Sequence, residues 1–365
     1  MSRKKNTQPI PFSEKMIHIL NAGALNLAMG IGYQTGLFDV MDQMTSPAGL
    51  PDIAAKSGLS QRYIQEWMGV MVSGGIVEIS TDATGTDLFY LPTEHGDLLT
   101  RSSGSDNLGV YSQEIPLLTM CAMEGVVNGF STGEGISYDH YPRFQQFMTE
   151  LANAKHMEVL VNCFLPSVGH GKIIKLLSQG IDVCDLGCGE GVAAILMAEA
   201  FPNSRFTGID ISNEALNTGK ANARSRGLIN IEFIRQDAAK IKDDPNMAAS
   251  FDYITAFDAI HDQSRPLDAL KSVHAMLKPD GIFSMVDIAA QSSIQGNMNH
   301  PMGQFLYTVS LMHCMPVGLM DNGTGLGMMW GEEKAIKMLG LADFSHVEVL
   351  KIPRDSFNLH YFCNK

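Results

Sequence analysis

The N-terminal part of the chain carries hydrophobic residues at helical spacing, separated by short polar breaks. This spacing predicts one or two helices over residues 12–44. A short helix and a glycine turn come next, and Ser60 is placed to cap a further helix that runs to about Ser73. Residues 76–79 and 88–91 show the alternation of a β-hairpin. Helices followed by a hairpin are the outline of a winged helix.

The pattern changes beyond residue 172, where short apolar runs alternate with helical segments. Such alternation predicts an α/β fold with a parallel sheet. The expected strands cover residues 181–186, 205–210, 231–238, 251–260, 281–286, 344–352 and 358–363. The last two are expected to close the sheet as antiparallel strands. Residues 105–170, between the two patterns, are expected to form a helical connector.

Composition indicates two folded domains and argues against several kinds of partner. The chain has 365 residues, of which 45% are hydrophobic, so disorder of the whole chain is excluded. Its formal net charge is −13, and so acidic a protein is repelled by the phosphates of nucleic acids and of anionic membranes. The predicted winged helix is itself acidic. We therefore expect it to serve dimerisation or to cover a substrate, and not to bind DNA.

The sequence is interpreted as that of a cytoplasmic protein. Its six cysteines are scattered and include no CxxC pair, which is typical of reduced thiols. Residues 1–11 are interpreted as a loose polar tail and not as a signal peptide. Residues 16–38 and 288–320 lack formal charge but are interrupted by Asn, Gln, Gly and His. Neither stretch is expected to cross a membrane.

A glycine-rich turn follows the first predicted strand of the α/β part. The strand ends at Asp185 and Leu186, and Gly187, Gly189 and Gly191 follow before the next helix. Glycines between a strand and a helix let the backbone approach a ligand closely. The spacing differs from the GxGxxG pattern of dinucleotide-binding turns. The carboxylate of Asp185 also suits a cationic ligand better than a pyrophosphate.

Acidic residues also end the next two predicted strands. Asp210 closes the second strand, where a carboxylate accepts hydrogen bonds from two ribose hydroxyls. Asp237 closes the third strand, where it is placed to accept from an adenine amine. Each acid alone also fits a helix cap or a turn. Because three acids end three consecutive strands, we interpret them as one ligand site at a single edge of the sheet.

This set of residues resembles the class I S-adenosylmethionine-dependent methyltransferases. The resemblance is carried by residues 183–189, Asp210, Gln236 with Asp237, and residues 278–281 before the fifth strand. It implies a Rossmann-like sheet of seven strands preceded by a mostly helical winged-helix domain. In small-molecule O-methyltransferases that domain forms the dimer interface, so a homodimer is implied. The implied bounds are 1–104 for the dimerisation domain, 105–170 for the connector and 171–365 for the methyltransferase domain.

The resemblance also implies which residues hold the cofactor, S-adenosylmethionine. Asp185 and the glycines of the turn would hold its amino-acid end, Asp210 its ribose and Asp237 its adenine. The full set of implied cofactor-binding residues is Asp185, Gly187, Gly189, Gly191, Asp210, Gln236, Asp237 and Phe257. The methyl acceptor is expected to be a small molecule.

His261 and Asp262 close the fourth predicted strand and are the candidate catalytic residues. In an open α/β sheet the ligand lies outside the carboxyl ends of the strands, so His261 is placed where the methyl group would be delivered. A histidine with a pKa of about 6.5 takes a proton from a hydroxyl near neutral pH. The pair resembles the His-Asp-Trp site of phenolic and indole O-methyltransferases, whose histidine is the general base. Here Gln263 stands in place of the Trp.

A second interpretation places a divalent metal, zinc or iron, at the same edge. His300 and His313 lie in a segment without charges, and with His261 they would form a metal site that keeps an open position. Asp262 or Asp287 would be a further ligand. The metal would bind an α-keto acid and stabilise its enolate for C-methylation. This arrangement resembles the α-keto acid C-methyltransferases.

Two other classes of protein remain as alternatives. A non-catalytic regulator would bind the cofactor and use the winged helix on DNA, which the acidic charge argues against. An NAD(P) oxidoreductase is disfavoured by Asp185 and by the spacing of the glycines. The first interpretation is therefore a methyltransferase that O-methylates a small molecule with His261 as the base, and the second is metal-assisted C-methylation.

Overall fold

A computed structural model describes residues 10–365, apart from the side chains at positions 105, 145, 146, 149 and 152–155. Most of the predicted N-terminal tail lies outside the described residues. The chain divides into two compact units between Pro116 and Leu117. Among the described residues, no helix is both long enough and apolar enough to cross a membrane.

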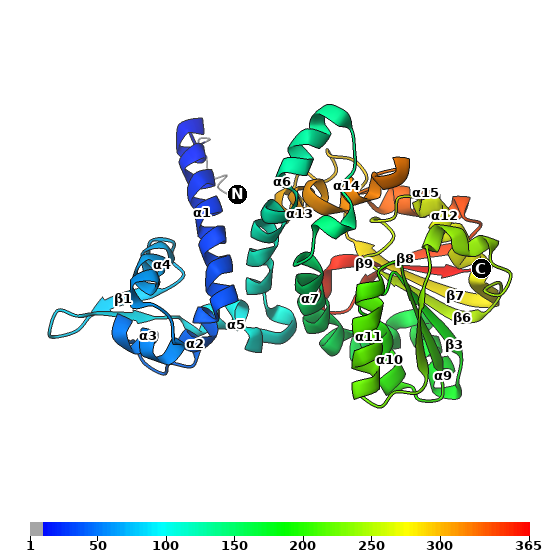
Figure 1. Ribbon diagram of the computed structural model, residues 1–365, viewed down its shortest axis with the longest axis horizontal. Coiled ribbons are helices and arrows are strands. Elements are labelled where there is room, and N and C mark those ends of the chain that lie inside the picture. The colour runs from blue at the N-terminus through cyan, green and yellow to red at the C-terminus, as the bar shows by residue number, and fades with distance from the viewer. Residues whose placement is uncertain (1–9) are drawn as a thin grey trace, which may run out of the picture. The chain divides into compact units, whose positions relative to one another are not determined.

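The first unit is a helical bundle with one β-hairpin (Figure 1). Its elements are α1 (Phe12–Thr35), α2 (Leu37–Asp42), α3 (Leu50–Ser57), α4 (Gln61–Ser73), β1 (Glu78–Thr81), β2 (Asp87–Tyr90), α5 (Thr93–Leu99), η1 (Arg101–Asp106) and η2 (Gly109–Gln113). The helical segment expected over residues 12–44 is divided at Gly36, which has a φ of 73°. Ser60 precedes α4 as expected, but its side chain makes no capping hydrogen bond.

The core of the first unit joins α1 to α4. The indole of Trp67 on α4 donates a hydrogen bond to the carbonyl of Ala28 on α1 at 2.8 Å. The ring of Phe38 meets Trp67 edge-on, with 5.2 Å between ring centroids. A Cβ at Gly32 would lie 2.5 Å from the indole, so glycine is what allows the two helices to approach this closely.

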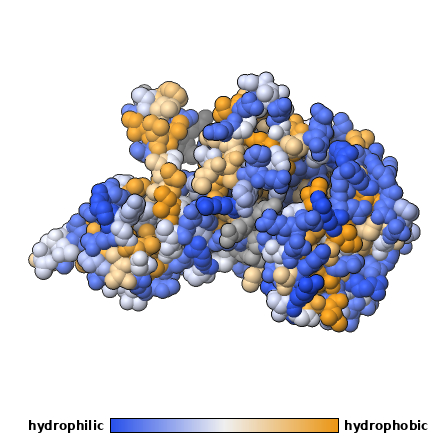
Figure 2. Space-filling view, viewed as in Figure 1, coloured by the Kyte–Doolittle hydropathy of each residue, from blue (hydrophilic) through white to orange (hydrophobic). Residues whose placement is uncertain are grey.

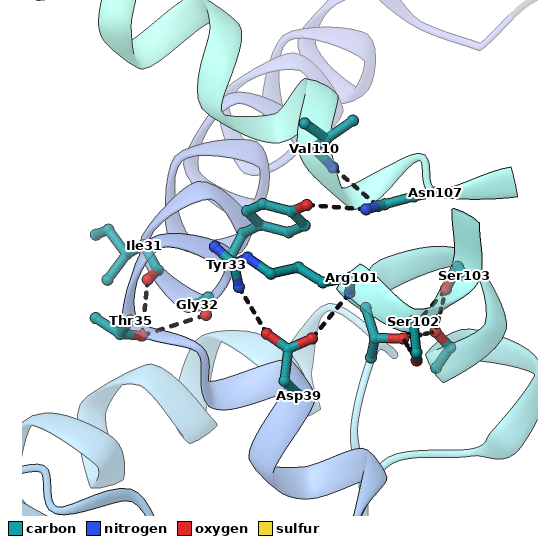
Figure 3. A network of polar contacts seen from close by, with 12 residues as sticks. Ile31, Gly32, Tyr33, Thr35, Asp39, Arg101, Ser102, Ser103, Asn107 and Val110 are labelled. Carbon is teal, nitrogen blue, oxygen red and sulfur yellow. Dashed lines mark hydrogen bonds and ion pairs between the residues drawn. The ribbon is translucent and has the colours of Figure 1, made fainter. Parts of the chain in front are cut away.

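A polar network fixes the segment after α5 to the start of the unit (Figure 3). The carboxylate of Asp39 accepts hydrogen bonds from the backbone N–H of Arg101 at 2.8 Å and from its guanidinium at 2.6 Å. The guanidinium lies 4.2 Å from the centre of the Tyr33 ring. The amide of Asn107 donates to the Tyr33 hydroxyl at 2.8 Å. Residues 101–110 therefore belong structurally to the first unit.

The second unit is built on a seven-stranded sheet in the order β5-β4-β3-β6-β7-β9-β8. The strands are β3 (Asp182–Leu186), β4 (Arg205–Asp210), β5 (Ile231–Arg235), β6 (Phe251–Phe257), β7 (Leu277–Ile288), β8 (His346–Ile352) and β9 (Asp355–Asn364). The first five pair in parallel, and β9 runs antiparallel to β7 and to β8. This confirms the predicted α/β fold and the antiparallel closing pair.

Helices precede this sheet in the sequence and also connect its strands (Figure 1). They are α6 (Glu114–Thr132), which begins before the division between the units, and α7 (Phe144–Val159), α8 (Leu165–Ser167), α9 (Lys172–Gln179), α10 (Val192–Ala200), α11 (Asn213–Ser225), α12 (Pro266–Met276), α13 (Gly303–Val309), α14 (Met315–Gly318) and α15 (Glu332–Leu341). Two π-helical turns continue α7 and α13: Leu160–Phe164 and Ser310–Cys314. Short 3-10 turns are η3 (Tyr138–His140), η5 (Val168–Gly171), η6 (Ala238–Asp243) and η8 (Met320–Asn322).

Apolar side chains fill both faces of the sheet. Neighbouring residues of β6 show this, because Tyr253 packs into a core with α9 and α10 while Ile254 packs into a core with α12 and α15. The first of these cores also contains Leu160 and Phe164. The end of the predicted connector therefore packs into the second unit, whereas the sequence analysis placed it between two domains.

Apolar side chains also remain exposed on α1. Phe12, Ile17, Leu20, Leu27 and Ile31 are all about half exposed or more. Figure 2 shows the hydrophobic surface along this helix. Water-exposed apolar side chains gathered along one helix mark an interaction surface.

Candidate functional site

The glycine turn after β3 is held in a conformation that requires glycine. Gly187, Gly189 and Gly191 have φ values of 70°, 54° and 71°. The N–H of Gly187 donates to the carbonyl of Ile209 at 2.8 Å, which ties the turn to the end of β4. A Cβ at Gly191 would lie 2.2 Å from the ring of Phe233. The turn therefore presents bare backbone at the carboxyl end of the sheet.

Asp210 is brought to this turn, as the sequence predicted. One of its carboxylate oxygens accepts from the N–H of Gly189 at 2.8 Å, and the other accepts from the N–H of Ser212 at 2.8 Å. Burial raises the pKa of Asp210, and these backbone donors oppose the shift. The carboxylate is thus fixed in place and keeps lone pairs for further donors.

Asp185 ends β3 beneath the same turn and is 3% exposed. The hydroxyl of Thr255 on β6 donates to its carboxylate at 2.8 Å. Burial raises the pKa of Asp185 to about 7; the hydroxyl opposes this rise and the negative charge of Asp210 adds to it. Among the described residues, neither acid forms an ion pair with a lysine or an arginine. The two acids therefore form a buried negative site that lacks a cation.

Asp237 follows β5 but already has partners. Its carboxylate accepts from the N–H of Ala239 at 3.0 Å and so caps η6. It also pairs with the guanidinium of Arg265 at 3.0 Å and lies 3.3 Å from the ammonium of Lys240. The adjacent Gln236 donates its backbone N–H to the carbonyl of Asp210 at 3.0 Å. The contact with adenine stays a prediction for these two residues.

Phe257 ends β6, and a strained turn follows it. Its half-buried ring meets Phe164 edge-on, with 5.6 Å between centroids. The next residue, Asp258, has a φ of 49°, and its N–H donates to the carbonyl of Val286 at 2.9 Å. A non-glycine residue in this conformation stores strain, and such strain is common at functional sites. The turn leads directly into His261.

His261 lies between two carboxylates. Its Nδ1 is 2.7 Å from a carboxylate oxygen of Asp287, at the end of β7, and its Nε2 is 3.4 Å from a carboxylate oxygen of Asp262. His261 is 3% exposed and Asp287 is fully buried. The structure therefore brings together the predicted catalytic pair and the acid that ends the neighbouring strand. Asp287 fixes the orientation of the ring, and Nε2 faces Asp262.

The two carboxylates control the protonation of His261. Burial alone would lower the pKa of the imidazole. The negative charges of Asp287 and Asp262 outweigh burial, so the pKa of His261 lies well above its usual range. The ring is therefore a strong base whose neutral form is favoured at alkaline pH.

His313 lies on the other side of Asp262, on the π-helical turn Ser310–Cys314. Its Nδ1 is 3.9 Å from the second carboxylate oxygen of Asp262 and 3.6 Å from the sulfur of Cys314. The residue is 3% exposed. π-Helical turns are rare and are frequent at functional sites. Two histidines thus flank one carboxylate.

Three aromatic rings that the sequence analysis did not select surround His313. The centroid distances from its ring are 5.5 Å to Tyr138, 4.8 Å to Tyr141 and 4.4 Å to Phe144. These residues lie far from the strand ends in sequence, so strand periodicity gave no signal for them. No motif in the predicted connector pointed to them.

The predicted three-histidine metal site is not assembled. His300 donates from Nε2 to the carbonyl of Ala289 at 3.0 Å and accepts at Nδ1 from the N–H of Met302 at 3.2 Å, so both ring nitrogens are occupied. Donor atoms of His261, Asp262 and Cys314 do lie within 4.8 Å of one another. Burial, with the charge of Asp262, raises the pKa of Cys314 to about 12, so the thiol is protonated when no metal is bound. His300 therefore does not join His261 in the predicted centre, and the cluster that forms contains a different set of residues.

Comparison with protein families supports a winged-helix part followed by a methyltransferase part. Residues 177–325 match the family described as a methyltransferase domain. Residues 23–101 match an Rv2258c-like winged HTH domain. The enzyme class and the winged helix predicted from the sequence are thereby confirmed at the level of these two domains.

Curated relatives match only part of the chain. A demethylmenaquinone methyltransferase from Listeria welshimeri is 30% identical over 121 residues, which are 33% of this chain and 50% of the relative. A ubiquinone biosynthesis O-methyltransferase from Haemophilus ducreyi is 32% identical over 110 residues, 30% of this chain and 46% of the relative. The chain thus spans about half the length of the curated relatives it matches.

Solved structures match over nearly the whole chain. A putative O-methyltransferase from Nostoc punctiforme has a TM-score of 0.71 at 18% identity, covering 98% of this chain and 100% of its own. Human N-acetylserotonin methyltransferase, solved with S-adenosylmethionine, has a TM-score of 0.70 at 15% identity and covers 99% of each chain. At these identities the likeness concerns the fold. With the family matches, it identifies the chain as a protein that joins a winged helix-turn-helix domain to a methyltransferase domain.

Proposed function

We propose that the chain is an S-adenosylmethionine-dependent methyltransferase that O-methylates a small molecule, with His261 as general base. The observation that carries this proposal is the buried His261–Asp287 pair, which follows β6 at the carboxyl edge of the sheet. Ala259, two residues before His261, lies against Gly187 of the glycine turn. The methyltransferase domain match supports the cofactor. The names of the relatives, which include an O-methyltransferase, support oxygen as the acceptor atom.

The buried acids support binding of a cation. When bound, S-adenosylmethionine supplies an electrophilic methyl group on a positively charged sulfur. In this proposal Asp185 faces the ammonium group, and the backbone of Gly187 and Gly189 lets the amino-acid end approach closely. Asp210, held by two backbone donors, accepts from the ribose hydroxyls. Asp237 and Gln236 are assigned to the adenine end of the cofactor. The ring of Phe257 is assigned to contact with the cofactor as well.

The proposed reaction uses one proton transfer. Nε2 of His261 takes the proton of the acceptor hydroxyl, and the oxygen forms a bond to the methyl carbon as the sulfur–carbon bond breaks. The electron pair of that bond stays on the sulfur, and the proton stays on His261 until water removes it. Asp287 holds Nδ1 protonated, and Asp262 stabilises the imidazolium that forms.

Replacement of His261 tests the proposal. A panel of phenols and indoles, assayed by release of homocysteine from the product S-adenosylhomocysteine, first identifies an acceptor. His261→Ala should then lower turnover by about 10²–10⁴ while affinity for S-adenosylhomocysteine stays within twofold. His346→Ala, at an exposed position on β8, is the matched control. Full activity of His261→Ala on the same acceptor would remove the proposed base.

We also propose that the protein is a cytoplasmic homodimer. The apolar side chains exposed along α1 support a self-associating surface (Figure 2). All six cysteines are free thiols, as expected in a reducing compartment. Sedimentation of the protein, compared with a variant carrying Leu20→Glu and Leu27→Glu, tests the dimer, because two charges in the surface should produce monomers. A parent that sediments as a monomer would contradict it.

A further inference from the structure

Three different donor groups of the second unit converge at the proposed base. One ring nitrogen of His261, one carboxylate oxygen of Asp262 and the sulfur of Cys314 lie within 4.8 Å of one another. His261 and Asp262 follow β6, whereas Cys314 ends the π-helical turn Ser310–Cys314, so the fold joins segments that are distant in sequence. An imidazole, a carboxylate and a thiol together are the ligand types that zinc prefers, and magnesium and calcium prefer oxygen alone. The cluster therefore has the chemistry of a zinc site.

The distance between His261 and Asp262 fits a shared ion better than a hydrogen bond. Nε2 of His261 lies 3.4 Å from Oδ1 of Asp262, beyond the usual range of about 2.7–3.2 Å for an N–H···O bond. Oδ1 is a buried atom, and it has no hydrogen-bond partner in the part of the chain that the structure describes. Tetrahedral zinc, with bonds of about 2.0–2.2 Å to nitrogen and oxygen, places two such ligand atoms about 3.4 Å apart. An ion would satisfy this oxygen.

The other nitrogen of His261 is held as it is in zinc sites. Asp287 accepts a hydrogen bond from Nδ1 at 2.7 Å, and both residues are buried. A histidine that binds a metal almost always donates its second ring N–H to a carboxylate, a carbonyl or water, which fixes the ring and turns the lone pair of Nε2 toward the metal. Asp287 therefore supplies the outer carboxylate of such a site.

An ion at this cluster would compete with the proposed chemistry. Nε2 of His261 takes the proton of the acceptor in the proposed reaction, and it has only one lone pair. A metal on that lone pair leaves no base. The side chain of Asp262 is 23% exposed, whereas His261 and Cys314 are 3% exposed, so Asp262 links the cluster to solvent. Zinc that enters here should therefore stop the reaction.

We propose that His261, Asp262 and Cys314 bind Zn²⁺, with water in the fourth position, and that the ion inhibits methyl transfer by occupying Nε2 of His261. Cys314 releases its thiol proton to solvent as the zinc–sulfur bond forms. The binding of zinc stands on the cluster alone, and its inhibitory effect rests on the proposed function. The site differs from the predicted metal centre because Cys314 replaces His300 and His313 and because the ion stops the reaction.

Metal binding is tested first, without any methyl acceptor. Co²⁺ is the probe, because a thiolate ligand produces a strong sulfur-to-cobalt absorption band in the near ultraviolet. The metal-free parent should develop this band at an equimolar amount of Co²⁺, and equimolar Zn²⁺ should remove it. Cys314→Ser should not develop the band, and Asp287→Asn should bind Zn²⁺ about 10–100-fold more weakly in calorimetry. Cys163→Ser, on the other π-helical turn, is the matched control and should behave as the parent.

Inhibition is tested next, with the acceptor that the panel of phenols and indoles identifies. Zn²⁺ at about ten times its dissociation constant should lower turnover of the parent about tenfold, and a chelator should restore it. Cys314→Ser should keep the basal turnover and lose the sensitivity to this concentration of Zn²⁺. Cys163→Ser should remain as sensitive as the parent.

Several results would overturn the inference. A parent without the cobalt band, or a Cys314→Ser variant that keeps it, removes the site. Zn²⁺ that binds the parent and Cys314→Ser equally would be an adventitious ion only. Zn²⁺ that raises turnover would overturn the inhibitory effect. Failure of the proposed function looks different, because the parent would then bind no S-adenosylhomocysteine and methylate no acceptor, while the cobalt band would still form.

Discussion

Replacing Asp287 by Asn would separate the chemistry of His261 from its position. The amide has the size of the carboxylate, so the ring stays in place, but it holds the charged imidazole less strongly. The bond between Asp287 and Nδ1 is 2.7 Å long and fully buried. A hydrogen bond to a charged group contributes about 1.5–3 kcal/mol. At about 1.4 kcal/mol for each pKa unit, Asp287→Asn should lower the pKa of His261 by about one to two units.

The pH dependence of turnover gives the readout. Because the pKa of His261 lies well above its usual range, kcat/KM of the parent should rise with pH through that raised value. In Asp287→Asn the rise should occur at lower pH, and the plateau should be about tenfold lower because the base is weaker. Asp268→Asn, at a partly exposed position on α12 away from His261, is the control. A rise at the same pH in Asp287→Asn and in the parent would refute the assignment of His261 as the titrating base.

The remaining predictions concern the cofactor site and the metal. Because the pKa of Asp185 is raised to about 7, affinity for S-adenosylhomocysteine should fall as pH decreases below 7, and Asp185→Asn should abolish this dependence in calorimetry. Asp210→Ala should weaken the same binding by about 1–3 kcal/mol, and unchanged affinity would contradict the ribose contact. Gly191→Ala should lower the Tm more than Gly227→Ala, since both have positive φ but only the first would strike Phe233. Dialysis against a chelator should leave turnover unchanged; loss of activity restored by zinc or iron would revive the metal mechanism.

Strand ends were predictable because each is a local feature. A short apolar run that ends in an acid indicates a buried strand and its carboxyl end, as at Asp185 and Asp210. Parallel pairing then brings these ends to one edge without further information. The backbone donors that fix Asp210 come from the same local segments. The positions of Asp185 and Asp210 could therefore be predicted from the few residues around each strand end.

Contacts between distant segments were not predictable in this way. The ion pair from Arg265 to Asp237 joins two segments whose proximity depends on the packing of α12. The aromatic cluster around His313 joins residues from separate helical turns, and its π-helical turn has no signature in the periodicity. The three-histidine metal site was predicted without information of this kind. His300 and His313 look equivalent in sequence, and only the fold shows that the backbone satisfies one of them.

The buried acids link binding to stability. The pKa of Asp185 in the folded state is about 7, above the ordinary value of 3.8 for an aspartate. Once the pH exceeds the pKa of the unfolded state, this group therefore lowers the stability of the folded state. Without a ligand, the free energy of unfolding should therefore decrease between about pH 4 and pH 7 through this group. A cationic ligand removes the penalty, because the ionised carboxylate then has a partner. The rise in Tm produced by S-adenosylhomocysteine should be larger at pH 8 than at pH 5, and in Asp185→Asn it should be equal at both. An equal rise in the parent would mean that no cation contacts Asp185.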